Sequence, residues 1–305
     1  MPPEPAPSPA LIEITPSIFY VFGENKSRFP FCSGLYVKGR DLRLLIDAGM
    51  GPAGLALVRS MGIDALVLSH CHIDHRLTRG EILETPVWCH EAEAGYLEDK
   101  ERFFTALGYY RGGFRPEYLF PVFPDGFEMK IARELADGET VDLGGLTLEV
   151  IHAPGHTPGH LAFYFPEADL LFSSDVDLTT FGPYYGHDFA DLDEFIRSIR
   201  RLKDLGASIV ATGHAGPFHD DLAERFQAYE NIIHQRDRQV LEMLSRPRPL
   251  EYFKHRGLIY RPAPSPVELN AWFELIHVAK HLERLAYLGY VEHRDGLWFR
   301  RRSRP

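Results

Sequence analysis

The residues best suited to chemistry are histidines and aspartates that follow apolar runs. The segment SHCHIDH, residues 69–75, places His70, His72, Asp74 and His75 within six positions directly after an apolar run. Imidazole nitrogens and carboxylate oxygens are the usual protein ligands of zinc and similar divalent ions. Such a polar cluster is poor core material, so it predicts a metal-binding loop at a strand end.

Three later segments offer further ligands of the same kind. PGHTPGH contains His156, FSSDVD contains Asp175 and ATGHAGPF contains His214, and each residue lies at the end of an apolar run. Strand ends at one edge of a sheet converge in space, so we expect these side chains to lie together. The repetition of the pattern is more specific than any single motif.

The first 220 residues are predicted to form strands separated by tight turns, and these strands must position the candidate ligands. Period and turn signals predict strands at 18–23, 34–49 (two, around the turn 39–41), 64–70, 140–156 (turning at 144–145), 160–175 (turning at 166–169) and 208–214. An amphipathic helix is predicted over 191–206, because Phe195, Ile199 and Leu202 are spaced by four and three and Gly206 suits its end.

The pattern becomes helical after residue 220. Apolar residues at helical spacing predict one helix from Asp221, and the capping box SPVE (265–268) predicts the start of a second. A hairpin turning at Asp295–Gly296 follows. The expected domains are therefore a Pro-rich flexible tail (1–11), a catalytic domain (12–220) and a small helical, winged-helix-like module (221–305).

Residues 95–134 interrupt the strand rhythm with ten phenylalanines and tyrosines. They predict a helix followed by an ordered loop. Two interpretations stay open: a small satellite core or dimer contact, and a hydrophobic lid over a substrate site.

Composition bounds the class of protein. The chain has 305 residues, 45% hydrophobic and 25% charged, which is typical of a globular protein. It shows no apolar stretch of membrane-spanning length and no secretory signal, and its three cysteines are too few for a disulfide framework, so we expect a cytoplasmic protein with no membrane partner. The first 220 residues carry 18 basic and 32 acidic residues, and the last 85 carry 15 and 11. An acidic body with a mildly basic end does not favour nucleic acid as a partner.

SHCHIDH, PGHTPGH, SSD and TGH, in this order and spacing, resemble the motifs of the metallo-β-lactamase superfamily, especially its glyoxalase II-like branch, over residues 12–220. The resemblance implies a four-layer αβ/βα sandwich with metals at one edge. Carried over by position, it implies a first metal held by His70, His72 and His156, a second held by Asp74, His75 and His214, and Asp175 bridging the two. The C-terminal segment HLERLAYLGYVEHRDG is similar to the winged-helix extension of members related to human lactamase-like protein 2, an endoribonuclease.

Two divalent ions, expected to be zinc with manganese or iron as alternatives, would bind a bridging hydroxide that acts as the nucleophile. Asp74 would orient that hydroxide as well as bind metal. The sequence departs from the resemblance after the first motif, where DHRLTRG replaces the usual Gly-Gly. We expect solvent salt bridges for Arg76 and Arg79, and the alternative for either is that it shapes the pocket.

Other polar residues have expected roles around the centre. His160 is expected beside the ligands rather than among them, His152 is expected to be structural, and His90 is expected to cap a helix. Cys71 is expected to point away from the metals. Residues near the bridging aspartate are candidates for substrate contact, namely Tyr184, Tyr185 and His187.

The leading hypothesis is a dinuclear metal-dependent hydrolase acting on a small-molecule thioester, ester or lactone of the acyl-CoA or acyl-glutathione type. Alternatives are a metal-dependent ribonuclease or phosphodiesterase, a mononuclear iron persulfide dioxygenase using only His70, His156 and Asp175, and a non-enzymatic regulator whose C-terminal module binds DNA. A homodimer is compatible with each hypothesis.

Overall fold

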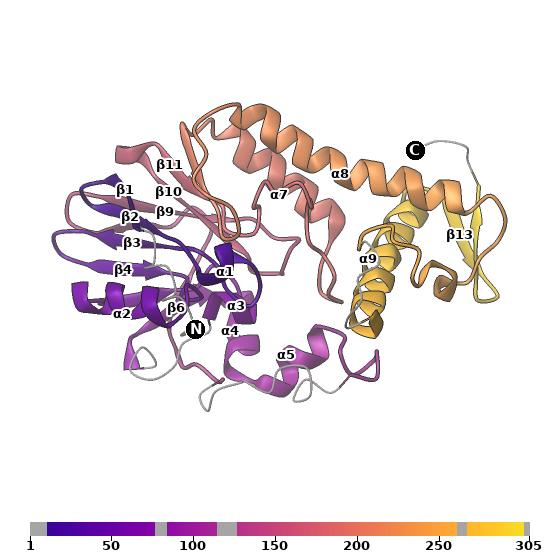
Figure 1. Ribbon diagram of the computed structural model, residues 1–305, viewed down its shortest axis with the longest axis horizontal. Coiled ribbons are helices and arrows are strands. Elements are labelled where there is room, and N and C mark those ends of the chain that lie inside the picture. The colour runs from indigo at the N-terminus through magenta and orange to yellow at the C-terminus, as the bar shows by residue number, and fades with distance from the viewer. Residues whose placement is uncertain (1–10, 77–83, 115–126, 261–266, 302–305) are drawn as a thin grey trace, which may run out of the picture.

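The computed structural model describes residues 11–76, 84–114, 127–260 and 267–301, in which two β-sheets face each other between outer helices (Figure 1). The first sheet has seven strands in chain order, antiparallel from β1 to β4 and parallel from β4 to β7. They are β1 (Leu11–Thr15), β2 (Ile18–Val21), β3 (Gly34–Lys38), β4 (Arg43–Ile46), β5 (Ala65–Val67), β6 (Val87–His90) and β7 (Ile131–Leu135).

The second sheet has the order β12-β11-β10-β9-β8, and its neighbours are antiparallel except for the parallel pair β11 and β12. Its strands are β8 (Thr140–Asp142), β9 (Thr147–His152), β10 (Leu161–Phe165), β11 (Leu170–Phe172) and β12 (Ile209–Ala211). The two hairpins predicted at 144–145 and 166–169 are both present.

Alternating side chains hold the layers together. Along β3, Leu35 and Val37 point into the core between the two sheets, whereas Tyr36 points to the outer face of the first sheet. On β4, Leu44 and Ile46 face inward and Leu45 faces outward. This period of two is what a strand buried on both faces requires, because successive side chains point to opposite sides.

Helices cover both outer faces and complete four layers. The first sheet is covered by α2 (Pro52–Met61), α4 (Glu91–Glu98) and α5 (Lys100–Ala106), and the second by α7 (Leu192–Asp204) and the start of α8 (Leu222–Met243). Helix α7 buries Phe195, Ile199 and Leu202, the three residues whose spacing predicts it. Short helical turns occur at α1 (Glu24–Ser27), α3 (Ile73–Arg76), η2 (Pro166–Ala168) and η3 (Leu250–Phe253).

The C-terminal part consists of the end of α8, α9 (Val267–Tyr287) and the hairpin of β13 (Val291–Arg294) and β14 (Leu297–Arg300) (Figure 1). Asp295 and Gly296 both have positive φ, as a two-residue hairpin turn needs. Phe226 and Tyr229 of α8 pack on the sandwich, whereas Val240 and Leu241 pack against α9. One continuous helix therefore belongs to both cores.

The aromatic insertion is partly described. Phe103 and Phe104 of α5 are buried in the core between the first sheet and its helices, and β7 is a strand that the sequence does not indicate. Tyr118, Phe120 and Phe123 lie outside the described residues, as do the Pro-rich tail up to residue 10, Arg79 and the first two residues of the predicted capping box. Among the described helices, none is long and apolar enough to cross a membrane.

Candidate metal centre

Seven polar side chains come together where strands of both sheets end. His70 follows β5, Asp74 and His75 lie on α3, and His156 follows β9, while Asp175 and His214 follow β11 and β12. His72 completes the set from the loop before α3. The side chains lie together, but they follow strands of two sheets rather than strands of one.

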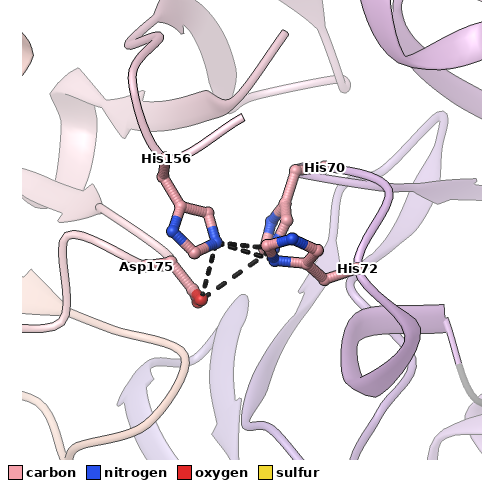
Figure 2. Close-up of side chains that lie close together, drawn as sticks. All are labelled: His70, His72, His156 and Asp175. Carbon is pink, nitrogen blue, oxygen red and sulfur yellow. Dashed lines mark hydrogen bonds and ion pairs between the residues drawn. The ribbon is translucent and has the colours of Figure 1, made fainter. Parts of the chain in front are cut away.

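The first group consists of His70, His72, His156 and Asp175 (Figure 2). Nδ1 of His72 lies 3.0 Å from Nε2 of His70 and 2.8 Å from Nε2 of His156, and the last two atoms are 3.2 Å apart. Asp175 Oδ2 lies 3.1 Å from His156 Nε2 and 3.8 Å from His70 Nε2. Three nitrogens and one oxygen therefore face a common point.

The second group consists of Asp74, His75 and His214. Nε2 of His75 lies 3.4 Å from Nε2 of His214, and Asp74 Oδ2 lies 3.5 Å from His214 Nε2. Asp175 reaches this group with its other oxygen, Oδ1, at 3.0 Å from His75 and 3.5 Å from His214. One carboxylate thus stands between two sets of imidazoles.

In most of these imidazoles, the ring nitrogen that points away from the centre has a hydrogen-bond partner that orients the ring. Nδ1 of His156 donates to the carbonyl of Tyr184 at 2.8 Å, and Nδ1 of His214 donates to the carbonyl of Ser27 at 2.7 Å. Nδ1 of His75 donates to Asp47 at 2.9 Å. A donating Nδ1 leaves the lone pair on Nε2, which is the atom that faces the centre.

The donor set fits divalent cations. Lone pairs of three imidazoles within 3.2 Å of one another repel unless a cation lies between them, and burial holds the pKa of His70 and His72 well below the ordinary value, so both rings are neutral. His72 uses Nδ1 toward the centre, and its buried Nε2 has no hydrogen-bond partner within the described part of the chain. Neutral imidazoles with aimed lone pairs are what a metal site requires.

Two buried carboxylates that support the centre have no motif in the sequence. Asp47 accepts hydrogen bonds from the Ser69 backbone at 2.8 Å and the Ser69 hydroxyl at 2.8 Å, in addition to His75. Glu93, at the start of α4, accepts from Cys71 N at 2.7 Å, Thr157 Oγ1 at 2.7 Å and Gly159 N at 2.6 Å. Glu93 therefore ties the loop that carries His70 and His72 to the loop that carries His156.

A third cluster joins Cys32 to Asp47 and His75. Burial raises the pKa of the Cys32 thiol to about 12, so this thiol stays protonated and is a poor metal ligand. Asp47 also faces the Nδ1 side of His75, away from Asp175.

Other predicted roles can be placed. His160 donates through Nδ1 to Ala153 and accepts at Nε2 from the backbone of Asp175 at 3.2 Å, so it positions Asp175. His90 caps α4 by accepting from Ala92 N at 3.1 Å, and His152 stacks on His90 with ring centroids 4.1 Å apart.

The expectation for Arg76 is wrong. This side chain is only 5% exposed, and its guanidinium lies 3.8 Å from the ring centroid of Phe127 and 4.6 Å from that of Phe103. Burial lowers its pKa to about 10. The short helix α3 turns Arg76 into the aromatic core, where its guanidinium lies over ring faces and donates to the carbonyl of Phe127 at 3.2 Å.

The three candidate substrate residues separate into two sets. His187 lies beside His72, with ring centroids 4.6 Å apart, and the Tyr184 hydroxyl lies 3.3 Å from His187 Nε2. Tyr185 lies elsewhere: it is fully buried, and its hydroxyl lies 2.6 Å from His281 Nε2 and 2.9 Å from Arg236 Nη1. Its contacts are with the C-terminal helices, so we retain only Tyr184 and His187 as substrate candidates.

Comparison with known proteins agrees with this geometry. The family model of the metallo-beta-lactamase superfamily matches residues 28–214, and the chain therefore belongs to that superfamily. The matched residues include every member of both groups of candidate ligands.

Individual relatives have low sequence identity to this chain. An atrochrysone carboxyl ACP thioesterase of Aspergillus fumigatus is 26% identical over 76% of this chain and 66% of its own length. A beta-lactamase-like protein 2 homolog of Caenorhabditis elegans is 31% identical over 51% of this chain and 50% of its own length. The chain thus spans between half and about two thirds of these relatives. A metallo-beta-lactamase family protein of Thermus thermophilus has the same fold, with a TM-score of 0.75 and 24% identity over 94% of this chain and 100% of that one.

Proposed function

We propose that this chain hydrolyses acyl thioesters with two divalent metal ions, expected to be zinc. The first ion would be held by His70, His72 and His156 and the second by Asp74, His75 and His214. The observation that carries the proposal is Asp175, whose two oxygens each face a different group of imidazoles.

Two bound ions would supply Lewis acidity and lower the pKa of water, so no nucleophilic side chain is needed. The chain's own thiols do not offer an alternative. Cys32, Cys71 and Cys89 are all buried, and burial raises the pKa of each thiol.

Residues of this chain have definite tasks in the proposed reaction. The Asp74 carboxylate lies 3.5 Å from His214 Nε2, and in the proposed reaction it would accept a hydrogen bond from the attacking water and so orient it. His160 and Tyr229 hold the backbone of Asp175, at 3.2 Å and 3.1 Å, and so restrict where its carboxylate lies. Their common task is to keep the donors in place before substrate arrives.

The choice of thioester is supported by the thioesterase among the relatives and by the surroundings of the site. Half-buried aromatic side chains lie next to His72, among them Phe189, which stacks on the His72 ring at 5.9 Å. Such surroundings suit an apolar acyl group better than a polyanionic nucleic acid backbone.

The first test is elemental analysis of protein purified without an affinity tag, for the wild type and for Asp74→Ala, with Asp204→Ala as a control on an exposed acid. We expect about two metals per chain in the wild type and the control, and about one in Asp74→Ala. Hydrolysis of an acyl-CoA panel should be lost with a chelator and restored by metal.

Other results would redirect the assignment. About one iron per chain, unchanged in Asp74→Ala and accompanied by oxygen uptake with a persulfide, would replace the hydrolase with the dioxygenase. Cleavage of single-stranded RNA without any thioester turnover would replace it with the ribonuclease.

A further inference from the structure

A cluster of rings extends from the metal centre to the C-terminal helices. We name it the aromatic wall and define it as Tyr109, Tyr184, His187, Phe189, Tyr260 and Phe273. It begins at His72, whose ring centroid lies 4.6 Å from that of His187 and 5.9 Å from that of Phe189. It ends on α9, where Phe273 lies 6.0 Å from His187 and 6.4 Å from Tyr260.

The wall is assembled from separate parts of the chain. Tyr109 follows α5, Tyr184 and His187 follow the bridging Asp175, and Phe273 belongs to α9. Phe273 joins them, because its ring also lies 6.0 Å from Tyr109 and 6.4 Å from Tyr184. The C-terminal helix therefore forms part of the surroundings of the candidate active site.

Exposure distinguishes four of the six members of the wall from ordinary core. Tyr184, Phe189, Tyr260 and Phe273 are half-buried, whereas the core ring of Phe195 is fully buried. Large rings that keep accessible surface beside a catalytic centre are typical of a ligand-binding surface.

One polar atom in the wall lacks a partner. His187 is 7% exposed, and its buried Nδ1 has no hydrogen-bond partner in the described ranges of the chain. Its Nε2 is already next to the Tyr184 hydroxyl at 3.3 Å. The Nδ1 edge is therefore the one left for a ligand, and a buried polar atom without a partner is costly unless a ligand supplies one.

We propose that the aromatic wall binds the acyl group of the substrate, and that this group is a planar aromatic acyl bearing a hydroxyl or carbonyl that bonds to His187 Nδ1. The inference rests on the proposed thioester hydrolysis. Planar rings pack against aromatic side chains by offset stacking and edge contacts, and all six members of the wall offer rings rather than aliphatic chains. A long flexible acyl chain gains less from such a surface.

The test compares two thioesters of the same leaving group, 2-hydroxybenzoyl-CoA and hexanoyl-CoA, on the wild type and Phe273→Leu. Leucine keeps an apolar side chain and removes the ring. We expect the wild type to prefer the aromatic thioester in kcat/KM, and Phe273→Leu to lose about tenfold on that substrate through KM while hexanoyl-CoA is little changed. Phe299→Leu, on the distant hairpin, serves as the matched control.

His187→Phe tests the polar contact. We expect it to lower kcat/KM for 2-hydroxybenzoyl-CoA more than for benzoyl-CoA. Equal turnover of aromatic and hexanoyl thioesters, with Phe273→Leu slowing both alike, would overturn the inference and leave thioester hydrolysis standing.

A binding measurement keeps the inference testable if no thioester is cleaved. Titration calorimetry with 2-hydroxybenzoate and hexanoate compares the two product acids on the metal-loaded protein. Tighter binding of the aromatic acid that is lost in Phe273→Leu supports the wall even if the hydrolase proposal fails. Equal binding of the two acids overturns it.

Discussion

At the scale of single residues, Asp175 is the carboxylate whose ionisation depends on both groups of imidazoles. Burial alone would raise its pKa, but the surrounding imidazoles of His75, His214, His156 and His70 hold it well below the ordinary value of an aspartate. The protein therefore keeps a buried carboxylate ionised among the six other donor side chains. An ionised carboxylate that faces both groups of imidazoles is prepared for cations before they arrive.

Glu93 is not one of the seven donors, yet we expect it to affect metal binding. In Glu93→Gln one oxygen becomes an amide NH2, so the three hydrogen bonds from Cys71, Thr157 and Gly159 cannot all be accepted. We expect metal affinity to fall about 10- to 100-fold, as for other partners that orient ligand loops. Competition with a chromophoric chelator measures this loss.

Glu91→Gln, an exposed neighbour in the same helix turn, is the control and should bind metal like the wild type. A shifted absorption spectrum of the cobalt-substituted Glu93→Gln protein would show that the ligands themselves have moved. Wild-type affinity together with a wild-type spectrum would contradict this role for Glu93.

The donor residues could be predicted from the sequence because each follows an apolar strand and bears a metal-binding side chain. Asp47 and Glu93 could not, because their partners lie on loops that only the tertiary fold brings near: Ser69 is 22 positions from Asp47, and Gly159 is 66 positions from Glu93. Arg76 was predicted on the surface because charge alone says nothing about neighbouring rings.

At the scale of elements, the segment from Phe181 to His187 connects the centre to the C-terminal helices. Its Tyr184 carbonyl orients His156, and the next residue, Tyr185, is held by His281 of α9 and Arg236 of α8. Arg236 also donates to the carbonyl of Pro183 at 2.9 Å. The helices outside the sandwich thus hold a loop that orients His156, a candidate metal ligand.

Tyr185→Phe removes the hydroxyl that His281 and Arg236 share. Both partners stay buried without it, so we expect the free energy of unfolding to fall by about 1–3 kcal/mol. Urea denaturation of metal-loaded protein measures the change. Tyr287→Phe, on the exposed side of α9, should be neutral; an equal loss in both variants would show that the buried hydroxyl has no special role.

Local patterns account for the strands and turns that were predicted, including the hairpin at Asp295–Gly296. They do not account for β6 and β7, two short parallel strands whose pairing depends on partners far along the chain. Sequence also suggests a boundary near residue 220, whereas α8 packs in both the sandwich and the C-terminal core.

At the scale of the whole molecule, several histidines are buried as neutral rings away from the centre. His281 faces Asp237 and Arg236 of α8, Arg284 of its own helix and Tyr185. Burial lowers its pKa below 6.5, and the two arginines add to that effect. The pKa of His277 also lies well below 6.5, again chiefly because the ring is buried.

These shifts predict that the protein is destabilised by acid. Below about pH 6.5 the histidine binds a proton in the unfolded chain but stays neutral in the folded protein, because its folded pKa is lower. The free energy of unfolding therefore falls as the pH falls toward the folded pKa. Each such histidine contributes about 1.4 kcal/mol per pH unit within that window. In urea denaturation between pH 6.5 and 5, His281→Gln should reduce the slope by about one histidine's share, and His293→Gln, an exposed site, should not. Identical slopes in all three proteins would contradict the prediction.

Helix α8 has a mechanical consequence. Its 22 residues form a rod about 33 Å long, at about 1.5 Å of rise per residue. Near its start Tyr229 donates to the backbone of Asp175, and further along Asp237 bonds to His281 of α9. A rigid rod cannot tilt at one end alone, so a load applied at the C-terminal hairpin is transmitted to the backbone of the residue between the two groups of imidazoles.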